Sequence, residues 1–374
     1  MSAQTAFVDD ARIARLFEPL RIGRLELSSR VAMSPMSRYF CADGVPRQPS
    51  ADYYRRRAET GVGLIISEGT YIGHPTAASY AGVPHFWGEA ALAGWQQVVD
   101  TVHEAGGRMF PQLWHTGSFR QSWMGWEPGV PPVGPSENLN AFTNHPESTR
   151  AMTDGDIAEV IDAYARAAAD AERLGFDGIE IHGAHGYLID EFFWERTNRR
   201  TDRWGGNRRD RTRFASEVIA AMRARVDADF PISFRFSQWK QQDYTVRLAE
   251  TPDQLLDVLG PLVDAGVSIL HASTRRLWEP GFPELGELTL AGWVKKLTGV
   301  PVIAVGGAGL DRPGLKAAAP ASLAILEAPL ARGDFDILAV GRALLADPLW
   351  LEKVRNGRVA ETVGYDKSHL ETLY

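Results

Sequence analysis

Two histidines and a tyrosine stand close together in the middle of the chain, at His182, His185 and Tyr187. They follow a short apolar, β-prone run at residues 178–181. We therefore expect them at the exit of a strand, where parallel α/β sheets and barrels bind their ligands. Paired imidazoles can hold one oxygen atom, and a tyrosine, with an ordinary pKa of about 10, is neutral at pH 7 and can deliver a proton. The three side chains suit the polarisation and protonation of an activated double bond.

A charged residue, Arg235, stands inside the apolar run 232–236, between two phenylalanines. A buried arginine is costly unless an anion compensates it. Two kinds of partner are open: an internal carboxylate, Glu68 or Glu180, or a ligand that is or becomes negatively charged. A unit charge pair ~4 Å apart at an effective dielectric near 20 is worth about 4 kcal/mol before desolvation, against about 0–1 kcal/mol for a surface pair. Only an interaction of about 4 kcal/mol, and not that of a surface pair, would shift a redox equilibrium by orders of magnitude.

Glycines follow the last two predicted strands, at Gly306-Gly307 and at Gly341, which precedes Arg342. In barrels, the turns after strands seven and eight frequently bind phosphate, because glycine lets backbone N–H groups approach the anion. Arg342 can add a bidentate contact. No G-x-G-x-x-G motif opens a βαβ unit, so the sequence does not indicate a Rossmann dinucleotide site.

Eight continuous apolar or β-prone runs alternate with amphipathic segments along the chain. Continuous runs are typical of strands that helices cover on the outside. The predicted strands are residues 31–36, 64–68, 109–113, 178–182, 232–236, 268–272, 302–305 and 337–340. The predicted helices include residues 90–104, 156–174, 211–225, 252–264 and 290–297. Eight strand–helix units predict an α/β fold of the (β/α)8, or TIM-barrel, type.

Two connecting segments complete this predicted barrel. Residues 21–27 contain a turn between β-prone residues, which predicts an N-terminal β-hairpin that closes the bottom of the barrel. The connection 114–152 after strand three is long and rich in Pro, Gly, Trp and Asn, so it should carry local structure or form a partial lid. Thr153 then suits the N-cap of the next helix. No linker divides the chain, so we expect residues 1–374 to form a single domain.

Composition excludes several classes of partner. The formal net charge is -7, which argues against a broad nucleic-acid or anionic-membrane surface. Residues 196–213 hold eight arginines, interrupted by acidic residues, and are expected to form a solvated segment held by ion pairs. Cys41 is the one cysteine, so disulfides and thiolate clusters within the chain are excluded. With no secretory-type start and no apolar run of about 18 residues, the expected location is the cytoplasm.

These residues together resemble the old yellow enzyme family of FMN-dependent ene-reductases. The resemblance runs in order from Leu16 to about Leu351. The matching segments are Pro35-Met36-Ser37-Arg38, Ser67-Glu68-Gly69-Thr70, Gln112-Leu113-Trp114, His182-Gly183-Ala184-His185-Gly186-Tyr187, residues 197–206, Phe234-Arg235, Gly306-Gly307 and Gly341-Arg342.

The resemblance implies a barrel that binds FMN non-covalently at the carboxyl ends of its strands. It implies that NAD(P)H reduces the flavin and that the substrate is a small molecule with a C=C bond conjugated to a carbonyl or nitro group. The residues implied at the cofactor are Pro35, Met36, Ser37 at flavin O4, Gly69, Gln112 at the pyrimidine edge, Arg235 at N1/O2, and Gly306, Gly307, Gly341 and Arg342 at the phosphate.

On the substrate side, the resemblance gives each residue of the motif a role. His182 and His185 would bind the carbonyl or nitro oxygen. Tyr187 would protonate the α-carbon after a hydride leaves flavin N5 for the β-carbon, and Trp114 would line the pocket. Such barrels often form homo-oligomers, although the sequence specifies no oligomeric state.

Other functions stay open from the sequence. His182 and His185, with His115 or His271 as a third ligand, would suit a metal-dependent barrel hydrolase. That function leaves Arg235 and the predicted phosphate site unused. A flavin-binding sensor or a flavin-dependent oxidative N-demethylase would use the same cofactor without alkene reduction. The sequence specifies neither the physiological substrate nor a preference between NADH and NADPH.

Overall fold

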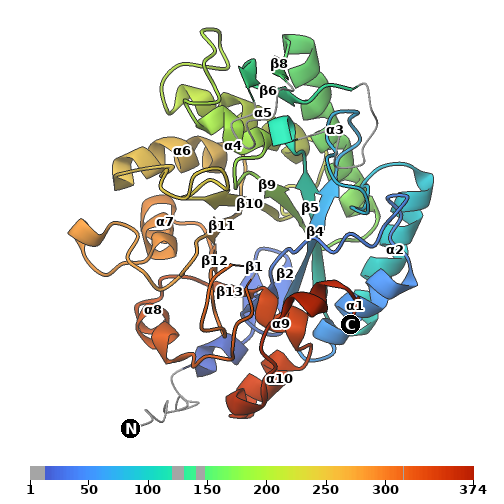
Figure 1. Cartoon of the computed structure of the whole chain (residues 1–374), viewed down its shortest axis with the longest axis vertical. Coiled ribbons are helices and arrows are strands. Elements are labelled where there is room, and N and C mark those ends of the chain that lie inside the picture. Colours follow the sequence, from blue (N-terminus) through green and yellow to red (C-terminus); the bar gives the residue numbers. More distant parts are fainter. Residues whose placement is uncertain (1–12, 120–129, 140–147, 315) are drawn as a thin grey trace.

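The computed structural model of the chain describes residues 13–119, 130–139, 148–314 and 316–374. Within these residues, eight parallel strands close into a barrel in the order β10-β11-β12-β13-β3-β4-β5-β9 (Figure 1). The strands are β3 (Val31–Met33), β4 (Leu64–Tyr71), β5 (Arg108–Trp114), β9 (Ile179–His182), β10 (Ile232–Ser237), β11 (Ile269–Ser273), β12 (Val302–Val305) and β13 (Ile337–Val340). The predicted (β/α)8 barrel is confirmed.

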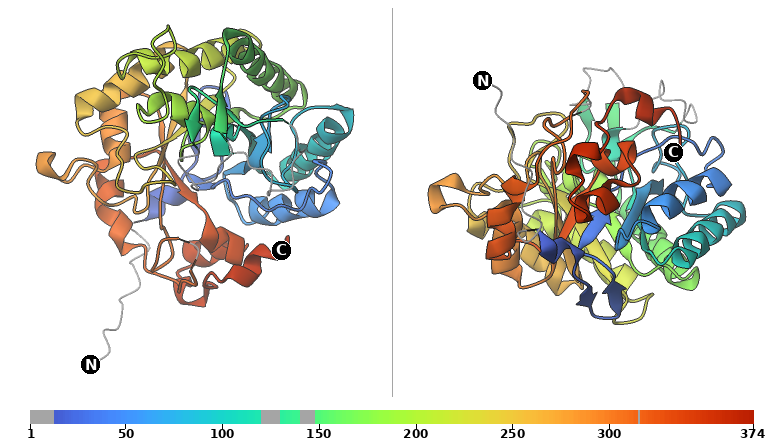
Figure 2. Two further views of the ribbon diagram at one scale, coloured as in Figure 1. Left: turned by 45° about the horizontal axis from the view of Figure 1, so that its top comes forward. Right: turned by 90° about the horizontal axis from the view of Figure 1, so that it is seen from below.

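Helices follow the strands and cover the outside of the barrel (Figures 1 and 2). They are α1 (Gln48–Ala58), α2 (Glu89–Glu104), α3 (Asp154–Arg173), α4 (Leu188–Phe193), α5 (Arg213–Arg223), α6 (Pro252–Asp264), α7 (Leu290–Thr298), α8 (Glu327–Arg332), α9 (Arg342–Ala346) and α10 (Trp350–Arg355). The predicted cap is confirmed, since the Thr153 hydroxyl accepts a hydrogen bond from the backbone N–H of Asp156 at 3.1 Å. In the part of the chain that the structure describes, no helix is long and apolar enough to cross a membrane.

Two predicted strands differ from the observed ones in length. The strand predicted at 31–36 ends at Met33, two residues before Pro35, which has no N–H to donate to a sheet. The strand predicted at 64–68 continues to Tyr71 through an irregularity in register between Ile66 and Gly69. Both differences lie at the carboxyl end of the barrel.

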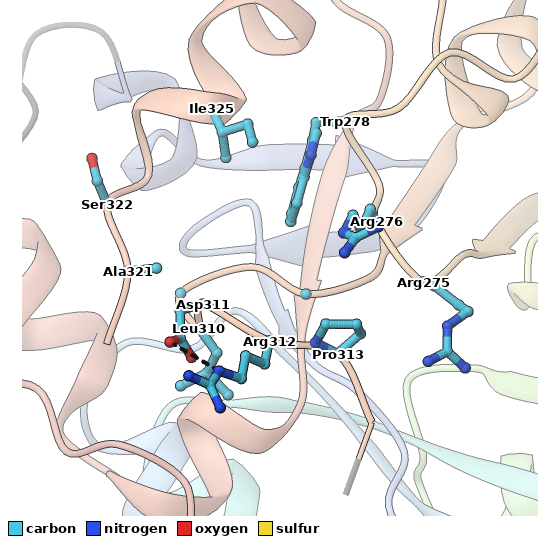
Figure 3. A pocket seen from close by; sticks show the side chains of 12 residues that line it. Arg275, Arg276, Trp278, Leu310, Asp311, Arg312, Pro313, Ala321, Ser322 and Ile325 are labelled. Carbon is cyan, nitrogen blue, oxygen red and sulfur yellow. Dashed lines mark ion pairs between the residues drawn. The ribbon is translucent and has the colours of Figure 1, made fainter. Parts of the chain in front are cut away.

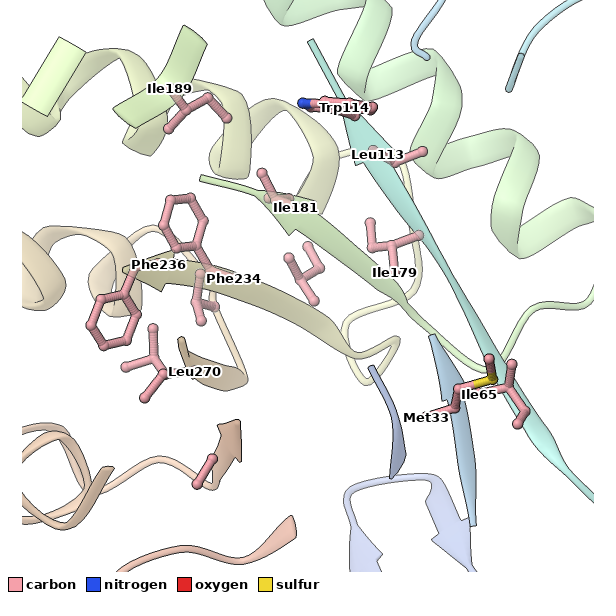
Figure 4. Packing of buried hydrophobic residues seen from close by; sticks show 14 of the residues in the cluster. Met33, Ile65, Leu113, Trp114, Ile179, Ile181, Ile189, Phe234, Phe236 and Leu270 are labelled. Atoms are coloured by element: carbon pink, nitrogen blue, oxygen red, sulfur yellow. The ribbon is translucent and has the colours of Figure 1, made fainter. Parts of the chain in front are cut away.

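The outward faces of the strands pack against the helices in one large hydrophobic cluster. Figure 4 shows Ile179 and Ile181 of β9, Phe234 and Phe236 of β10 and Leu270 of β11 in this cluster, and all five side chains are fully buried. Burying a side chain of this size stabilises the fold by about 1.5–3 kcal/mol. The alternation of a strand then turns the intervening side chains into the barrel.

A second hydrophobic cluster fills the amino-terminal half of the barrel interior. Leu64, Ile66 and Phe110 pack there against Leu25 and Leu27. The two leucines come from a hairpin of β1 (Leu20–Ile22) and β2 (Leu25–Leu27), which is dark blue at the lower end of the barrel in the right view of Figure 2. The predicted hairpin therefore closes the bottom of the barrel as expected.

Inward side chains change from apolar to polar towards the carboxyl ends of the strands. On β11, Ile269 belongs to the interior hydrophobic cluster, whereas His271 and Ser273 above it are buried polar residues. On β5, Phe110 is followed by Gln112. The polar half of the interior is therefore at the end of the barrel where (β/α)8 enzymes place their sites.

The long connection after β5 carries local structure, as predicted. It begins with a 3-10 turn (Gly117–Phe119) and includes a small sheet of β6 (Val133–Gly134), β7 (Asn138–Leu139) and β8 (Ser148–Ala151). Phe119 reaches the predicted site, with its ring centroid 5.5 Å from that of Tyr187. A lid function for this segment remains a prediction.

Candidate active site

One cavity at the carboxyl end of the barrel gathers most of the predicted site residues. It has a volume of about 160 Å³ and is lined by Pro35, Met36, Ser37, Gly69, Gln112, Trp114, His182, His185, Tyr187, Arg235 and Gln241. These residues come from β3, β4, β5, β9 and β10 and the turns that follow them. Of the predicted residues, only the four at the turns after β12 and β13 lie elsewhere.

The histidine–tyrosine motif forms a compact aromatic group. The ring centroids of His182 and His185 are 5.2 Å apart, and those of His182 and Tyr187 are 5.1 Å apart. Trp114 stacks on His182 at 5.7 Å with an interplanar angle of 16°. A tight turn brings the second histidine back over the barrel, since His185 has a φ of 64° and Gly186 one of 81°.

Both imidazoles are neutral at pH 7. Burial, together with the charge of Arg235, lowers the pKa of His182 to about 3 and also lowers the pKa of His185 well below its ordinary value. A neutral imidazole carries one N–H to donate. Nε2 of His185 lies 2.9 Å from the Ser273 hydroxyl, which fixes the ring and leaves Nδ1 for a ligand.

The phenol of Tyr187 also keeps its proton at neutral pH, because burial raises its pKa. The side-chain amide of Gln241 donates a hydrogen bond to the phenol oxygen at 3.3 Å. That oxygen acts as an acceptor towards Gln241, so its own O–H remains free to donate into the cavity. Gln241 was not predicted from the sequence, because it lies in the turn after β10 and no local pattern connects it with Tyr187.

Arg235 is buried without an ion pair among the described residues. Its Nη2 lies 3.5 Å from the Ser273 hydroxyl, and its Nε has no hydrogen-bond partner in the part of the chain that the structure covers. The alternative in which Arg235 forms an ion pair with Glu68 or Glu180 is therefore wrong, because neither carboxylate contacts the guanidinium directly. Glu68 accepts a hydrogen bond from the backbone of Arg38 instead, at 2.8 Å.

Glu180 is engaged by a group of polar residues inside the barrel, one layer below the cavity. His271 lies 2.7 Å from its carboxylate, Gln112 donates to it at 2.8 Å, and the Ser233 hydroxyl donates to it at 3.1 Å. We call Gln112, Glu180, Ser233 and His271 the interior polar layer. Gln112 is the member that also lines the cavity.

Gly69 and Trp114 are fitted to each other across β4 and β5. A Cβ atom at Gly69 would lie 2.6 Å from the Trp114 ring, so another residue there would displace the indole from the cavity wall. The irregular register of β4 brings Gly69 opposite Gln112.

The turns after β12 and β13 have the features of an anion site. Gly306 and Gly307 have φ values of 150° and 79°, and Nη1 of Arg342 is buried with no hydrogen-bond partner among the described residues. A Cβ atom at Gly341 would lie 3.4 Å from the sulfur of Met36, which places that turn beside the wall of the first cavity.

A second cavity, also of about 160 Å³, lies against the turn after β12 (Figure 3). Gly307, Trp278 and Arg276 line it, together with Arg312, which pairs with Asp311 at 3.5 Å. The turn that carries the predicted phosphate residues therefore has a cationic surface next to it.

The donors of the site fit FMN. An isoalloxazine offers hydrogen-bonding atoms along its pyrimidine edge, and FMN adds a phosphate. The unpartnered Nε belongs to Arg235 on the cavity wall, and the unpartnered Nη1 belongs to Arg342 on the turn after β13. Buried donors are rarely left without a partner, so these atoms indicate a polar, anionic ligand.

The histidines proposed for a metal site are used differently. Within residues 13–119, 130–139, 148–314 and 316–374, no group of three or more His, Cys, Asp or Glu residues could hold a metal ion. Of the two possible third ligands, His115 bonds to Thr76 at 3.0 Å and His271 to Glu180. The geometry gives the metal-hydrolase alternative no third ligand.

Comparisons with known proteins point to one family. Residues 15–361 match the NADH:flavin oxidoreductase / NADH oxidase family. The chain is 37% identical over 354 residues to an NADH oxidase of Thermoanaerobacter brockii, covering 92% of the chain but only 51% of that relative, so it spans about half of the relative's length. It is 33% identical over 361 residues to chanoclavine-I aldehyde reductase fgaOx3 of Penicillium roqueforti, covering 95% and 92%.

Solved structures give the same result. Morphinone reductase in complex with tetrahydroNAD superposes with a TM-score of 0.80 at 31% identity, over 95% of this chain and 93% of that one. An old yellow enzyme homologue from Zymomonas mobilis gives 0.78 at 26% identity, over 95% and 96%. The chain therefore belongs to the NADH:flavin oxidoreductase / NADH oxidase family, that of the old yellow enzymes, whose members are FMN-dependent enzymes that consume NAD(P)H.

Proposed function

We propose that the chain is an ene-reductase, which uses NAD(P)H to reduce C=C bonds conjugated to carbonyl or nitro groups. The observation that carries this proposal is the meeting of a protonated phenol, Tyr187, with two neutral imidazoles, His182 and His185, at one cavity. The cavity thus contains hydrogen-bond donors that can bind a substrate oxygen and an acid that can protonate a carbon atom.

His182 and His185 hold the carbonyl or nitro oxygen, and their N–H groups draw electrons from the conjugated double bond. Bound FMN, once reduced by NAD(P)H, supplies the hydride that the β-carbon receives. Tyr187 then gives its phenolic proton to the α-carbon, and the amide of Gln241 stabilises the phenolate that remains. Hydride and proton together account for the two hydrogens added across the bond.

On the cofactor side, we propose roles for the remaining predicted residues. Pro35, Met36, Ser37, Gly69, Gln112 and Arg235 would contact the flavin ring, and Gly306, Gly307, Gly341 and Arg342 would hold the phosphate. Trp114 forms a wall of the substrate pocket, where its ring stacks beside His182. We also propose that residues 1–374 form a single FMN-binding domain.

The names of several relatives support the substrate class. Four rice relatives, 38–40% identical over 57–61% of this chain, are 12-oxophytodienoate reductases or putative ones, and two fungal relatives are aldehyde reductases. Reduction of oxygen-bearing small molecules is common to these names.

Stopped-flow measurement of the two half-reactions tests the proposal. Wild-type enzyme reduced by NADPH or NADH is expected to be reoxidised by 2-cyclohexenone, N-methylmaleimide or a nitroalkene. Tyr187→Phe is expected to slow this reoxidation by about 10²-fold or more, the range typical of a lost general acid, and to leave reduction by NAD(P)H nearly unchanged. Tyr164→Phe is the matched control, because Tyr164 is a fully buried tyrosine on α3 that does not line the cavity.

Two outcomes would contradict the proposal. If Tyr187→Phe slowed both half-reactions equally, Tyr187 would not be the acid. If the wild-type enzyme consumed N-methylated amines but none of the alkenes, oxidative demethylation would replace alkene reduction as the function.

A further inference from the structure

The interior polar layer places a carboxylate directly beneath the residues that face the cofactor. Glu180 and His182 are successive inward residues of β9, and Ser233 and Arg235 are the matching pair on β10. In the register of the sheet, Ser233 lies beside Glu180, and Arg235 lies between His182 and His271. Glu180 is therefore one inward position below the guanidinium and fully buried.

Three side chains hold this carboxylate. His271 and Ser233 contact one carboxylate oxygen, at 2.7 and 3.1 Å, and Gln112 contacts the other, at 2.8 Å. Burial alone would raise the pKa of Glu180, but the hydrogen bonds of His271 and Gln112 and the charge of Arg235 lower it instead. Burial also lowers the pKa of His271. At pH 7 the layer is thus a carboxylate that accepts hydrogen bonds from neutral partners.

The first consequence concerns Arg235. The negative charge of Glu180 acts on the guanidinium within the buried interior of the barrel, where charges interact more strongly than at a surface. No ion pair forms between them, so the guanidinium keeps its donors for the cavity while part of its charge is offset. The electrostatic potential at the pyrimidine edge of bound FMN would then depend on both charges. Glu180 would offset part of the effect of Arg235 there.

The second consequence concerns Gln112. Its amide nitrogen donates to Glu180, so the amide cannot flip without breaking a hydrogen bond to a charged group. With the nitrogen engaged below, the amide oxygen is the atom left to accept a hydrogen bond from a ligand in the cavity. Glu180 thereby orients the side chain of Gln112 so that its amide oxygen, and not its nitrogen, is available to a ligand in the cavity.

We propose that Glu180, held by His271, is a positioning residue that sets the reduction potential of bound FMN by offsetting the charge of Arg235 and orienting Gln112. The proposal requires FMN in the cavity but not alkene reduction. Reduction adds negative charge to the flavin, which Arg235 favours and Glu180 opposes. Removing the charge of Glu180 should therefore make the flavin easier to reduce.

The test is the reduction potential of the FMN-loaded enzyme, measured against a reference dye at pH 7. Glu180→Gln keeps the shape of the side chain and removes its charge. We expect reduced FMN to gain at least about tenfold in binding relative to oxidised FMN, which is a positive shift of about 30 mV for a two-electron couple. Glu180→Asp, which keeps the charge, is expected to restore a potential near that of the wild type.

Glu191→Gln is the matched control. Glu191 is also fully buried, but burial raises its pKa to about 8, so its replacement by an amide removes little charge at pH 7. It contacts Ser118 and does not line the cavity. The reduction potential of FMN bound to Glu191→Gln is expected to match that of FMN bound to the wild type. A shift in Glu191→Gln as large as in Glu180→Gln would overturn the assignment to Glu180.

Ser233→Ala is a second variant, to be measured if Glu180→Gln does not bind FMN. This small change removes one donor from the carboxylate and leaves its charge less compensated, so the potential is expected to move in the negative direction. An unchanged potential in Glu180→Gln, or in Ser233→Ala if Glu180→Gln is not loaded, would overturn the proposal. Because no alkene is present in this measurement, its outcome is independent of the proposed ene-reductase activity.

Discussion

At the scale of single residues, the hydrogen bond between Gln241 and Tyr187 governs how the phenol can act. The amide donates to the phenol oxygen at 3.3 Å, so it stabilises the phenolate more than the phenol. Gln241 also lies at the open side of the cavity, where its exposed side chain can respond to a ligand. It is therefore expected to influence proton transfer without contributing to folding.

Gln241→Met tests this influence. Methionine has a similar length and cannot donate, so reoxidation of the enzyme by an enone is expected to slow by up to about tenfold, the value of one ordinary hydrogen bond. Reduction by NAD(P)H should not change. Gln242→Met is the control, because Gln242 bonds to the backbone carbonyl of Gly186 and not to the phenol. Equal rates for Gln241→Met and the wild type in stopped-flow assays would show that the amide has no effect on the proton.

The sequence was sufficient to predict the types of the site residues but not their partners. His182, His185 and Tyr187 end an apolar run, and strand ends are where barrels bind ligands, so their place followed from local pattern. Their protonation follows from burial in the closed barrel and, for the two histidines, also from the charge of Arg235, whereas Ser273 holds the ring of His185; Arg235 and Ser273 belong to other strands. Such contacts depend on the register of the closed barrel, for which no local pattern exists.

At the scale of elements, most strands lie within about two residues of their predicted bounds. The runs at 302–305 and 337–340 match β12 and β13 because helices bury their outward faces and the barrel interior buries their inward faces, which gives continuous apolar sequence. The extension of β4 to Tyr71 was missed, since Glu68, Gly69 and Thr70 do not look like a strand. Pairing with β5 imposes the extended conformation there.

Gly69→Ala probes this irregular part of β4. The added methyl group would meet the ring of Trp114 at 2.6 Å, so the indole must leave its place in the cavity wall. The expected cost is about 1–3 kcal/mol of unfolding free energy, as for other overpacked sites, together with weaker FMN binding measured by fluorescence. Gly155→Ala on α3 is the control, because its methyl group would meet only Thr153 at 3.6 Å and alanine favours a helix. Wild-type FMN affinity in Gly69→Ala would contradict the fitted contact.

At the scale of the whole molecule, two kinds of buried group oppose each other as pH changes. Burial lowers the pKa of His182 and His185, so below pH 6.5 protons bind the unfolded chain better and stability falls. Burial raises the pKa of Glu68 to about 7 and that of Glu191 to about 8, so these carboxyls stay protonated in the folded chain. The protein is therefore expected to be most stable near the pH where the destabilisation by the histidines at lower pH equals the destabilisation by the carboxyls at higher pH.

Glu191 dominates the alkaline side of this balance. Its folded pKa of about 8 lies above the ordinary value of 4.5, so its stabilisation is complete below pH 4.5 and is lost as pH rises towards 8. Above about pH 7.5, one unit above the ordinary histidine pKa of 6.5, the two histidines are mostly neutral in both states and contribute little slope. The unfolding free energy of the wild type, measured with urea at constant excess FMN, should therefore fall by up to about 1.4 kcal/mol per pH unit. Glu191→Gln has no proton to lose and should remove most of this fall, whereas Glu89→Gln, at an exposed position on α2, should not. Parallel curves for the wild type and Glu191→Gln would mean that the carboxyl is already ionised in the folded barrel.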